Sequence, residues 1–189
     1  MKIMMITLRN ILTAFLFLWI LLSVSDAQAR SSWGIGASYE VRDSNPEKGF
    51  GLRLERSILS GVPLLDFKLR AHFSYFSESV SSYRDIQLPT ELDVYDYGIA
   101  ATGGISFGLL HPYAGVGLGK ERFDAEQSAP QGLSLSDDSI YWNLYGGLRL
   151  PILPVLNPFV EYRFTRLMSS EEFDYSHNSR FAFGIMMNF

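Results

Sequence analysis

Apolar and polar side chains alternate along eight separate segments of this chain, and no other feature restricts its fold as strongly. The clearest segment is residues 65–75, with an apolar or aromatic residue at every odd position and a charged or polar residue at every even position. A period of two puts the two kinds of side chain on opposite faces of a β-strand. The other segments are residues 33–42, 50–56, 95–107, 113–121, 140–150, 160–165 and 180–189.

The connections between these segments alternate in character. Residues 57–63, 108–112 and 151–158 are weakly charged and contain proline, which indicates tight turns. Residues 43–48, 78–93, 123–138 and 169–178 are polar and, apart from the first, longer. Short turns at one end and longer loops at the other are typical of barrels in the bacterial outer membrane. The sequence therefore predicts an all-β fold, an eight-stranded antiparallel up-and-down transmembrane β-barrel with its longer loops outside the cell.

Energetic cost decides which face of the strands meets lipid. With the opposite orientation, Lys68 and Arg70 would lie in hydrocarbon at about 2–4 kcal/mol each near the midplane. The charged face is therefore predicted to line the lumen. Its charged residues are Glu40, Arg42, Arg53, Glu55, Asp66, Lys68, Arg70, Asp96, Glu121, Arg149, Glu161, Arg163 and Arg180. Since side chains fill an eight-stranded barrel, we expect a packed ion-pair network, with a narrow ion channel as the alternative.

The N-terminus has the features of a secretory signal peptide. Lys2 and Arg9 precede an apolar run over residues 11–22, and Ala27-Gln28-Ala29 supplies a small-x-small cleavage pattern. The run is shorter than the roughly 20 apolar residues that a spanning helix needs. We therefore predict cleavage after Ala29, leaving the barrel as residues 30–189.

Composition excludes several classes of function. The chain has no cysteine, which rules out disulfide scaffolds, thiolate metal sites and cysteine nucleophiles. Its net charge of −4 argues against a nucleic-acid partner. Its three histidines are scattered, and no EF-hand spacing occurs, so no resident metal or cofactor is expected. The predicted outer loops are nevertheless acidic, which leaves open weak bridging by divalent cations or binding of an unidentified extracellular ligand.

Three basic residues fall on the outward face near the outer ends of the strands. They are Lys120, Arg122 and Arg166. Long basic side chains at this level can reach the membrane interface, where lipid phosphates lie. We therefore predict that they contact lipopolysaccharide.

Several motifs resemble the outer-membrane β-barrel domain family, the small barrels similar to OmpA and OmpX. Residues 112–119 (PYAGVGLG) look like its PYxGxGxG strand, and residues 145–150 with 157–164 are similar to its penultimate hairpin. The C-terminal residues resemble the signal read by the barrel-insertion machinery, with Gly184, Met187 and Phe189 at its glycine, hydrophobic and terminal aromatic positions. The resemblance implies an integral, multi-pass outer-membrane protein, which we expect to be monomeric, but this fold hosts many activities.

One short motif points to chemistry. His177 and Ser179 are two residues apart and therefore share the outer face of the last strand. This arrangement resembles the outer-membrane lipid A 3-O-deacylases, small barrels with a histidine and a serine on the lipid-facing wall. In that pattern an asparagine follows the serine and a glutamate lies downstream; here Arg180 follows, and the orienting acids could only be Glu171, Glu172 or Asp174.

Three functions remain from the sequence. The first is a non-enzymatic barrel that acts in envelope integrity or surface interaction through its loops. The second is a hydrolase that modifies lipid A through His177 and Ser179. The third is a soluble, lipocalin-like barrel, which would place the apolar face inside and the charged face in water.

Overall fold

The structure is a computed structural model that describes residues 33–59, 64–81, 90–127, 134–153, 155–168 and 177–189. The predicted signal peptide and its cleavage position lie outside these ranges. Among the described residues, no helix is long and apolar enough to cross a membrane.

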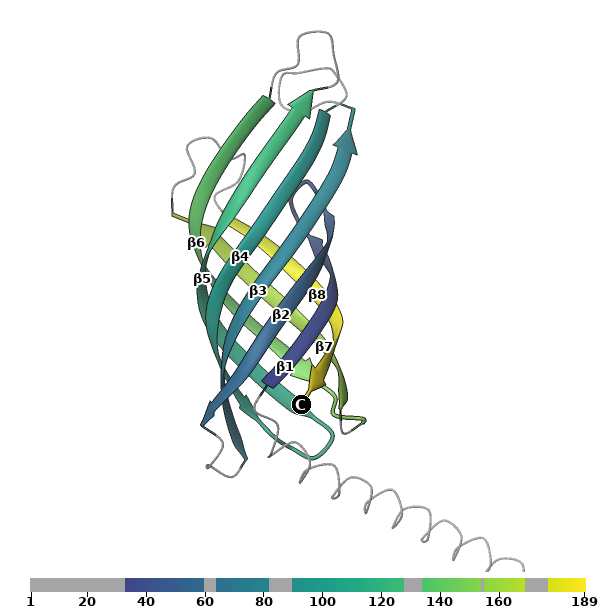
Figure 1. The fold of residues 1–189 in the computed structure, drawn as a ribbon, viewed down its shortest axis with the longest axis vertical. Coiled ribbons are helices and arrows are strands. Elements are labelled where there is room, and N and C mark those ends of the chain that lie inside the picture. Colours follow the sequence, from purple (N-terminus) through teal and green to yellow (C-terminus); the bar gives the residue numbers. More distant parts are fainter. Residues whose placement is uncertain (1–32, 60–63, 82–89, 128–133, 154, 169–176) are drawn as a thin grey trace, which may run out of the picture.

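Eight antiparallel strands close into one barrel in simple sequence order, and β1 pairs with β8 (Figure 1). The strands are β1 (Trp33–Arg42), β2 (Lys48–Leu59), β3 (Leu65–Val80), β4 (Thr90–Ile105), β5 (His111–Gln127), β6 (Ser134–Arg149), β7 (Leu156–Leu167) and β8 (His177–Asn188). The predicted up-and-down barrel is thus confirmed. The lower end of the barrel is the one that carries the C-terminus in Figure 1, and the upper end is the opposite one.

Seven of the eight strands are longer than the sequence analysis predicts, and β1 alone has its predicted bounds. Strands β3 to β6 have 16 or 17 residues, whereas the other four have 10 to 12. Residues 78–80, 90–93, 123–127 and 134–138 were expected in loops, and this expectation is wrong because they belong to strands. Since a strand rises about 3.3 Å per residue, four or five extra residues add about 15 Å. These strands therefore form a raised wall at the upper end (Figure 1).

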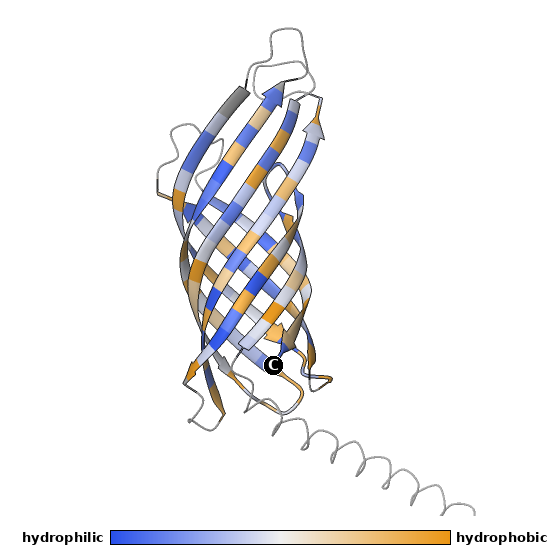
Figure 2. Cartoon of the chain, in the orientation of Figure 1, coloured by the Kyte–Doolittle hydropathy of each residue, from blue (hydrophilic) through white to orange (hydrophobic). Residues whose placement is uncertain are grey.

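The wall of the lower barrel is apolar on its outside. Phe50, Leu52, Ile99 and Leu118 are all more than half exposed, and apolar and polar residues alternate along the strands (Figure 2). This arrangement argues against the lipocalin-like alternative, because a soluble barrel needs its polar face in water.

A tight turn shows how the lower end is closed. Phe107 and Leu110 exchange backbone hydrogen bonds of 2.8 and 3.1 Å between β4 and β5. Gly108 adopts a positive φ of 61° inside this turn, a conformation that glycine tolerates best.

Candidate functional site

The charged residues predicted to line the lumen all lie on the inner face of the barrel. Asp66 and Lys68 are half-buried near the lower end. The others are at most 4% exposed, namely Glu40, Arg42, Arg53, Glu55, Arg70, Asp96, Glu121, Arg149, Glu161, Arg163 and Arg180. Charges this deeply buried are tolerated only when they are paired and hydrogen-bonded.

Glu55 is one of two acidic centres in the lower interior. Its carboxylate pairs with Arg149 at 2.8 Å and with Arg70 at 2.9 Å. Lys68 approaches it at 3.7 Å and also binds Asp66 at 2.9 Å. The cluster thus joins β2, β3 and β6 across the lumen.

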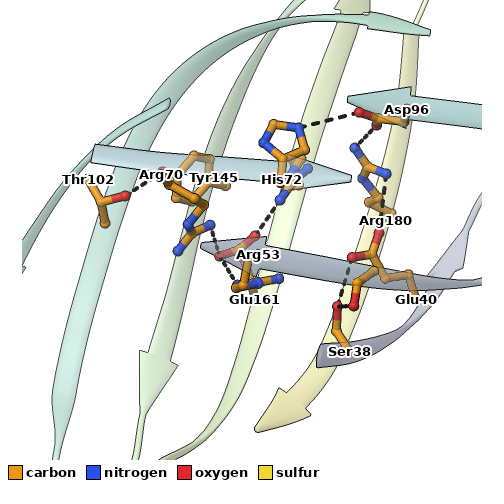
Figure 3. Close-up of polar contacts among 12 residues, drawn as sticks. Ser38, Glu40, Arg53, Arg70, His72, Asp96, Thr102, Tyr145, Glu161 and Arg180 are labelled. Carbon is orange, nitrogen blue, oxygen red and sulfur yellow. Dashed lines mark hydrogen bonds and ion pairs between the residues drawn. The ribbon is translucent and has the colours of Figure 1, made fainter. Parts of the chain in front are cut away.

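Glu161 is the second centre and serves more partners. Its Oε2 accepts from Arg70 at 2.6 Å and from Arg53 at 3.0 Å (Figure 3). The hydroxyl of Tyr113 donates to the same oxygen at 3.0 Å, while Oε1 accepts from Arg163 at 3.0 Å. One carboxylate therefore holds three arginines in place.

The upper part of the network contains Asp96 and Glu40. Arg180 binds both, contacting Glu40 at 3.2 Å (Figure 3). The hydroxyl of Tyr141 donates to Asp96 and lies 2.8 Å from Nε2 of His72. The network therefore continues from the ion pairs into the side chains of Tyr141 and His72.

Glycines make room for large side chains inside the barrel. A Cβ added to Gly115 or Gly119 on β5 would collide with Tyr145 or Tyr141 on β6. A Cβ at Gly147 would come within 2.6 Å of the ring of Tyr113. The glycine-rich motif of residues 112–119 thus lets tyrosines lie flat against the neighbouring strand. The sequence analysis did not identify Tyr141 and Tyr145 as lumen residues, although they share the parity of Arg149.

An apolar cluster lies inside the upper half of the barrel. It consists of Phe76, Leu92, Val94, Phe123, Ala125, Tyr141 and Leu167, and each is at most 6% exposed. The guanidinium of Arg42 lies 4.7 Å from the centre of the Phe76 ring, so the cluster rests directly on the charged network. The sequence analysis missed this cluster because several of its members fall in the segments it assigned to loops.

The three outward basic residues have different surroundings. Lys120 binds Asp138 at 2.7 Å, and Arg122 binds Asp124 at 3.0 Å. Arg166 is exposed and stands on β7 between its register partners Trp142 on β6 and His177 on β8. The three thus form a rim across β5 to β7.

His177 and Ser179 lie on the outer side of β8, as their parity requires. The Ser179 hydroxyl oxygen accepts from the hydroxyl of Tyr162 at 3.0 Å, and its backbone N–H donates to Asp43 at 2.8 Å. The ring of His177 lies 6.0 Å from that of Phe164. The acids considered as orienting groups, Glu171, Glu172 and Asp174, lie outside the described residues.

The residues that resemble an assembly signal lie on and just after β8, the strand that closes the barrel by pairing with β1. Gly184 accommodates the ring of Phe159, since a Cβ there would lie 2.7 Å from its Cε1. Met187 and Phe189 are exposed on the outer wall. The backbone of Phe189 exchanges hydrogen bonds with Trp33 at 2.9 and 3.2 Å, which joins the chain end to β1.

No group of three or more metal-ligating side chains converges among the residues that the structure describes. Several acids expected in loops stand on the upper strands instead, namely Glu78, Glu91, Asp93, Asp124, Glu126, Asp137 and Asp138.

Comparison with known proteins gives the fold a context. No family model matches this chain, and neither does any curated protein sequence. Neisserial surface protein A (NspA) is 17% identical over 83% of this chain and 96% of that protein, with a TM-score of 0.56. Ail, the attachment invasion locus protein of Yersinia pestis, solved with the heparin analogue sucrose octasulfate, is 18% identical over 84% and 97%, with a TM-score of 0.55.

A major outer membrane protein from Thermus thermophilus is similar at 10% identity, covering 82% of this chain and 99% of that one, with a TM-score of 0.65. This chain therefore has the fold of the small eight-stranded barrels of bacterial outer membranes.

Proposed function

We propose that this chain is an integral barrel of the bacterial outer membrane that acts through its surface, in envelope integrity or surface interaction, without a pore or an active site. The apolar outer wall matches a lipid environment. The predicted signal peptide would deliver the lower end to the periplasm and leave the upper end, with its raised wall, outside the cell.

The filled interior is the observation that carries this proposal. Buried ion pairs occupy the lower lumen, and the apolar cluster lies above them. An ion would have to break charge pairs and then cross apolar side chains. We expect no conductance steps when the folded protein is added to planar bilayers. Regular steps at high protein loading would contradict a closed lumen.

Membrane partition with heat-modifiability tests the location. A carbonate-resistant outer-membrane band that migrates differently in unboiled and boiled samples is expected for an integral barrel. A soluble periplasmic or secreted band without a shift would contradict the proposal.

The raised wall carries acidic side chains on its outward face. Its outward face carries two cross-strand pairs of acids, Glu91 with Glu126 and Asp93 with Asp124. Acids directly opposite one another repel. Arg122 already offsets part of this repulsion at Asp124, so a cationic partner would relieve the cost mainly at Glu91 and Glu126. Such a surface would repel a polyanion, in contrast to Ail, whose structure holds a heparin analogue.

Binding of a basic peptide and of heparin to the vesicle-embedded protein tests this surface. We expect the peptide to bind and heparin not to bind. Replacing the four acids with their amides should weaken peptide binding at least tenfold. Arg56 is exposed on β2 opposite Trp33, near the lower end, and Arg56→Ala should leave peptide binding unchanged. Preference for heparin would contradict the proposed partner.

The rim of Lys120, Arg122 and Arg166 is proposed to contact lipopolysaccharide phosphates. Lys120 and Arg122 lie on β5 and Arg166 lies on β7, with β6 between them, at the upper edge of the apolar wall. The acids beside Lys120 and Arg122 could share a divalent cation with the lipid. The triple alanine variant should lose affinity for lipopolysaccharide, with Arg56→Ala as the matched control. Equal affinities would exclude this contact.

A lipid A hydrolase is the alternative, favoured only by the exposure of His177 beside Ser179 on the lipid-facing wall. Mass spectrometry of lipid A from expressing cells separates the two functions. We expect unchanged acyl chains. Loss of one acyl chain that Ser179→Ala abolishes would establish the enzyme instead.

A further inference from the structure

Three arginines stand side by side on the inner face of the closing strands. Arg163 on β7 is the register partner of Arg180 on β8, which is in turn the partner of Arg42 on β1. All three are at most 4% exposed. Like charges directly opposite one another destabilise a sheet, so this row needs negative charge from elsewhere.

The acids of the lumen leave Arg163 the least compensated of the three. Arg180 binds Glu40 and Asp96, and Arg42 binds Glu121 at 3.2 Å. Arg163 has a single ion pair among the described residues, from Nη2 to Glu161, whose other oxygen already serves Arg53 and Arg70. The Nε and Nη1 of Arg163 and the Nε of Arg180 are buried without a hydrogen-bond partner in the described part of the chain.

A row of neutral polar side chains adjoins the arginines on the upper side. Asn143, Thr165 and Asn178 are consecutive register partners on β6, β7 and β8, and each is at most 1% exposed. The Nδ2 of Asn143 and the hydroxyl of Thr165 have no partner within the described ranges. The next position in the row is Gly117, which adds no side chain.

The donors in these two rows outnumber the acceptors. Within these two rows, as far as the structure describes their surroundings, the unpartnered donor groups are Arg163 Nε and Nη1, Arg180 Nε, Asn143 Nδ2 and the Thr165 hydroxyl, while the unpartnered acceptors are Asn143 Oδ1 and Asn178 Oδ1. The charged residues that the sequence predicts in the lumen lie on the inner face of the barrel, between the lower end and the apolar cluster. They comprise seven bases and six acids, so bases exceed acids by one. A buried positive charge without a counter-charge is costly.

We propose that the barrel interior binds a small monovalent inorganic anion of the halide class, held by Arg163 and Arg180 with Asn143 and Thr165 as neutral donors. The anion supplies the missing negative charge and also accepts hydrogen bonds from the unpartnered N–H and O–H groups. Water would satisfy the hydrogen bonds but would leave the positive charge uncompensated. A metal cation is excluded by the arginines.

Bromide is the probe for this site, because elemental mass spectrometry quantifies it directly. The full barrel, folded in zwitterionic detergent in the presence of bromide, is brought to equilibrium dialysis against dilute bromide. We expect saturable binding of about one bromide per chain, which chloride displaces and gluconate, too large for a packed lumen, does not. If the wild-type protein binds no bromide in excess of the dialysis buffer, the proposal is overturned in favour of water alone.

Two variants locate the ion. Arg163→Met keeps an unbranched apolar stem but removes the guanidinium group and its charge, and it should abolish the excess bromide. The matched control is Arg166→Met on the outer face of the same strand, which should retain it. Retention by Arg163→Met would overturn the assignment. If that variant does not fold, Thr165→Val, which has nearly the same shape, should weaken bromide binding at least fivefold; unchanged affinity there would also contradict the site.

Discussion

The polarity of the inner and outer faces of strand β4 is reversed between its lower and upper parts. In its lower part, Ile99 is 69% exposed on the outside and Asp96 is fully buried inside. In its upper part, Leu92 is fully buried inside, and Glu91 is exposed outside. The strand geometry is the same along its length, so the difference reflects the surroundings. The lower part suits hydrocarbon outside, whereas the upper part is built like a barrel in water.

The two interiors are consequently held together by different forces. The lower interior depends on buried ion pairs centred on Glu55 and Glu161, and each of these two carboxylates has several basic partners that offset its desolvation. The upper interior depends on apolar packing between β3, β4, β5, β6 and β7. Substitutions that remove charge should thus affect the lower part, and those that remove volume should affect the upper part.

The largest effect is expected at Glu161. Glu161→Gln keeps the shape of the side chain but leaves Arg53, Arg70 and Arg163 without their shared carboxylate. The free energy of unfolding should fall by about 3–5 kcal/mol, as is typical when one partner of a buried ion pair is removed. Urea titration of the barrel in vesicles measures this, with exposed Glu126→Gln as the control. Equal stabilities of the two variants would mean that the lower network contributes little.

A somewhat smaller effect is expected in the upper cluster. Leu92→Ala should cost about 2–5 kcal/mol, because the removed methyl groups leave a cavity in a packed interior. The same titration applies. An unchanged unfolding midpoint would show that the upper interior is loosely packed and would break the comparison between the two parts.

The polarity of the outer face can be tested within one strand. Ile99→Arg in the lower part should cost about 2–4 kcal/mol in bilayers, because a charge then faces hydrocarbon. Glu91→Arg in the upper part should change stability by no more than about 0.5 kcal/mol, since that face meets water. If both substitutions cost the same, the raised wall would also lie in the membrane.

The smallest effect concerns two adjacent glycines. Gly147→Ala adds a Cβ that would meet the ring of Tyr113 at 2.6 Å, whereas the nearest atom to a Cβ at Gly146 is a backbone oxygen at 3.8 Å. We expect a loss of about 1–3 kcal/mol for Gly147→Ala, as for other overpacked interiors. Gly146→Ala should be nearly neutral. Similar losses for both would argue against a tyrosine packed on Gly147.

The sequence analysis was most successful where one rule applied without interruption. It placed the first strand at residues 33–42, which the structure reproduces, because every outward residue there is apolar or aromatic. It failed for residues 90–93, where outward Glu91 and Asp93 were interpreted as loop residues. The period of two continues through these residues, but their polarity is reversed, so a rule based on an apolar outer face ends the strand too early.

The lumen residues divide in the same way into those that a sequence rule placed and those that it did not. The inward charges followed from parity together with the cost of placing a charge in lipid, whereas Tyr141, Tyr145 and the apolar cluster did not, since an aromatic or aliphatic residue fits either face. His177 and Ser179 were placed correctly on the outer face, yet the contacts of Ser179 with Tyr162 and Asp43 depend on strand register.

Local patterns were enough to show that this chain forms strands, how many there are, and which side chains face inward along the lower barrel. These properties are local, because alternation and turn residues act over a few positions. The partners of the inward charges became clear only in three dimensions, as when Arg53 binds Glu161, 108 residues further along the chain. Such pairs depend on the closure of β1 on β8 and on the stagger of all eight strands, which is a property of the whole barrel.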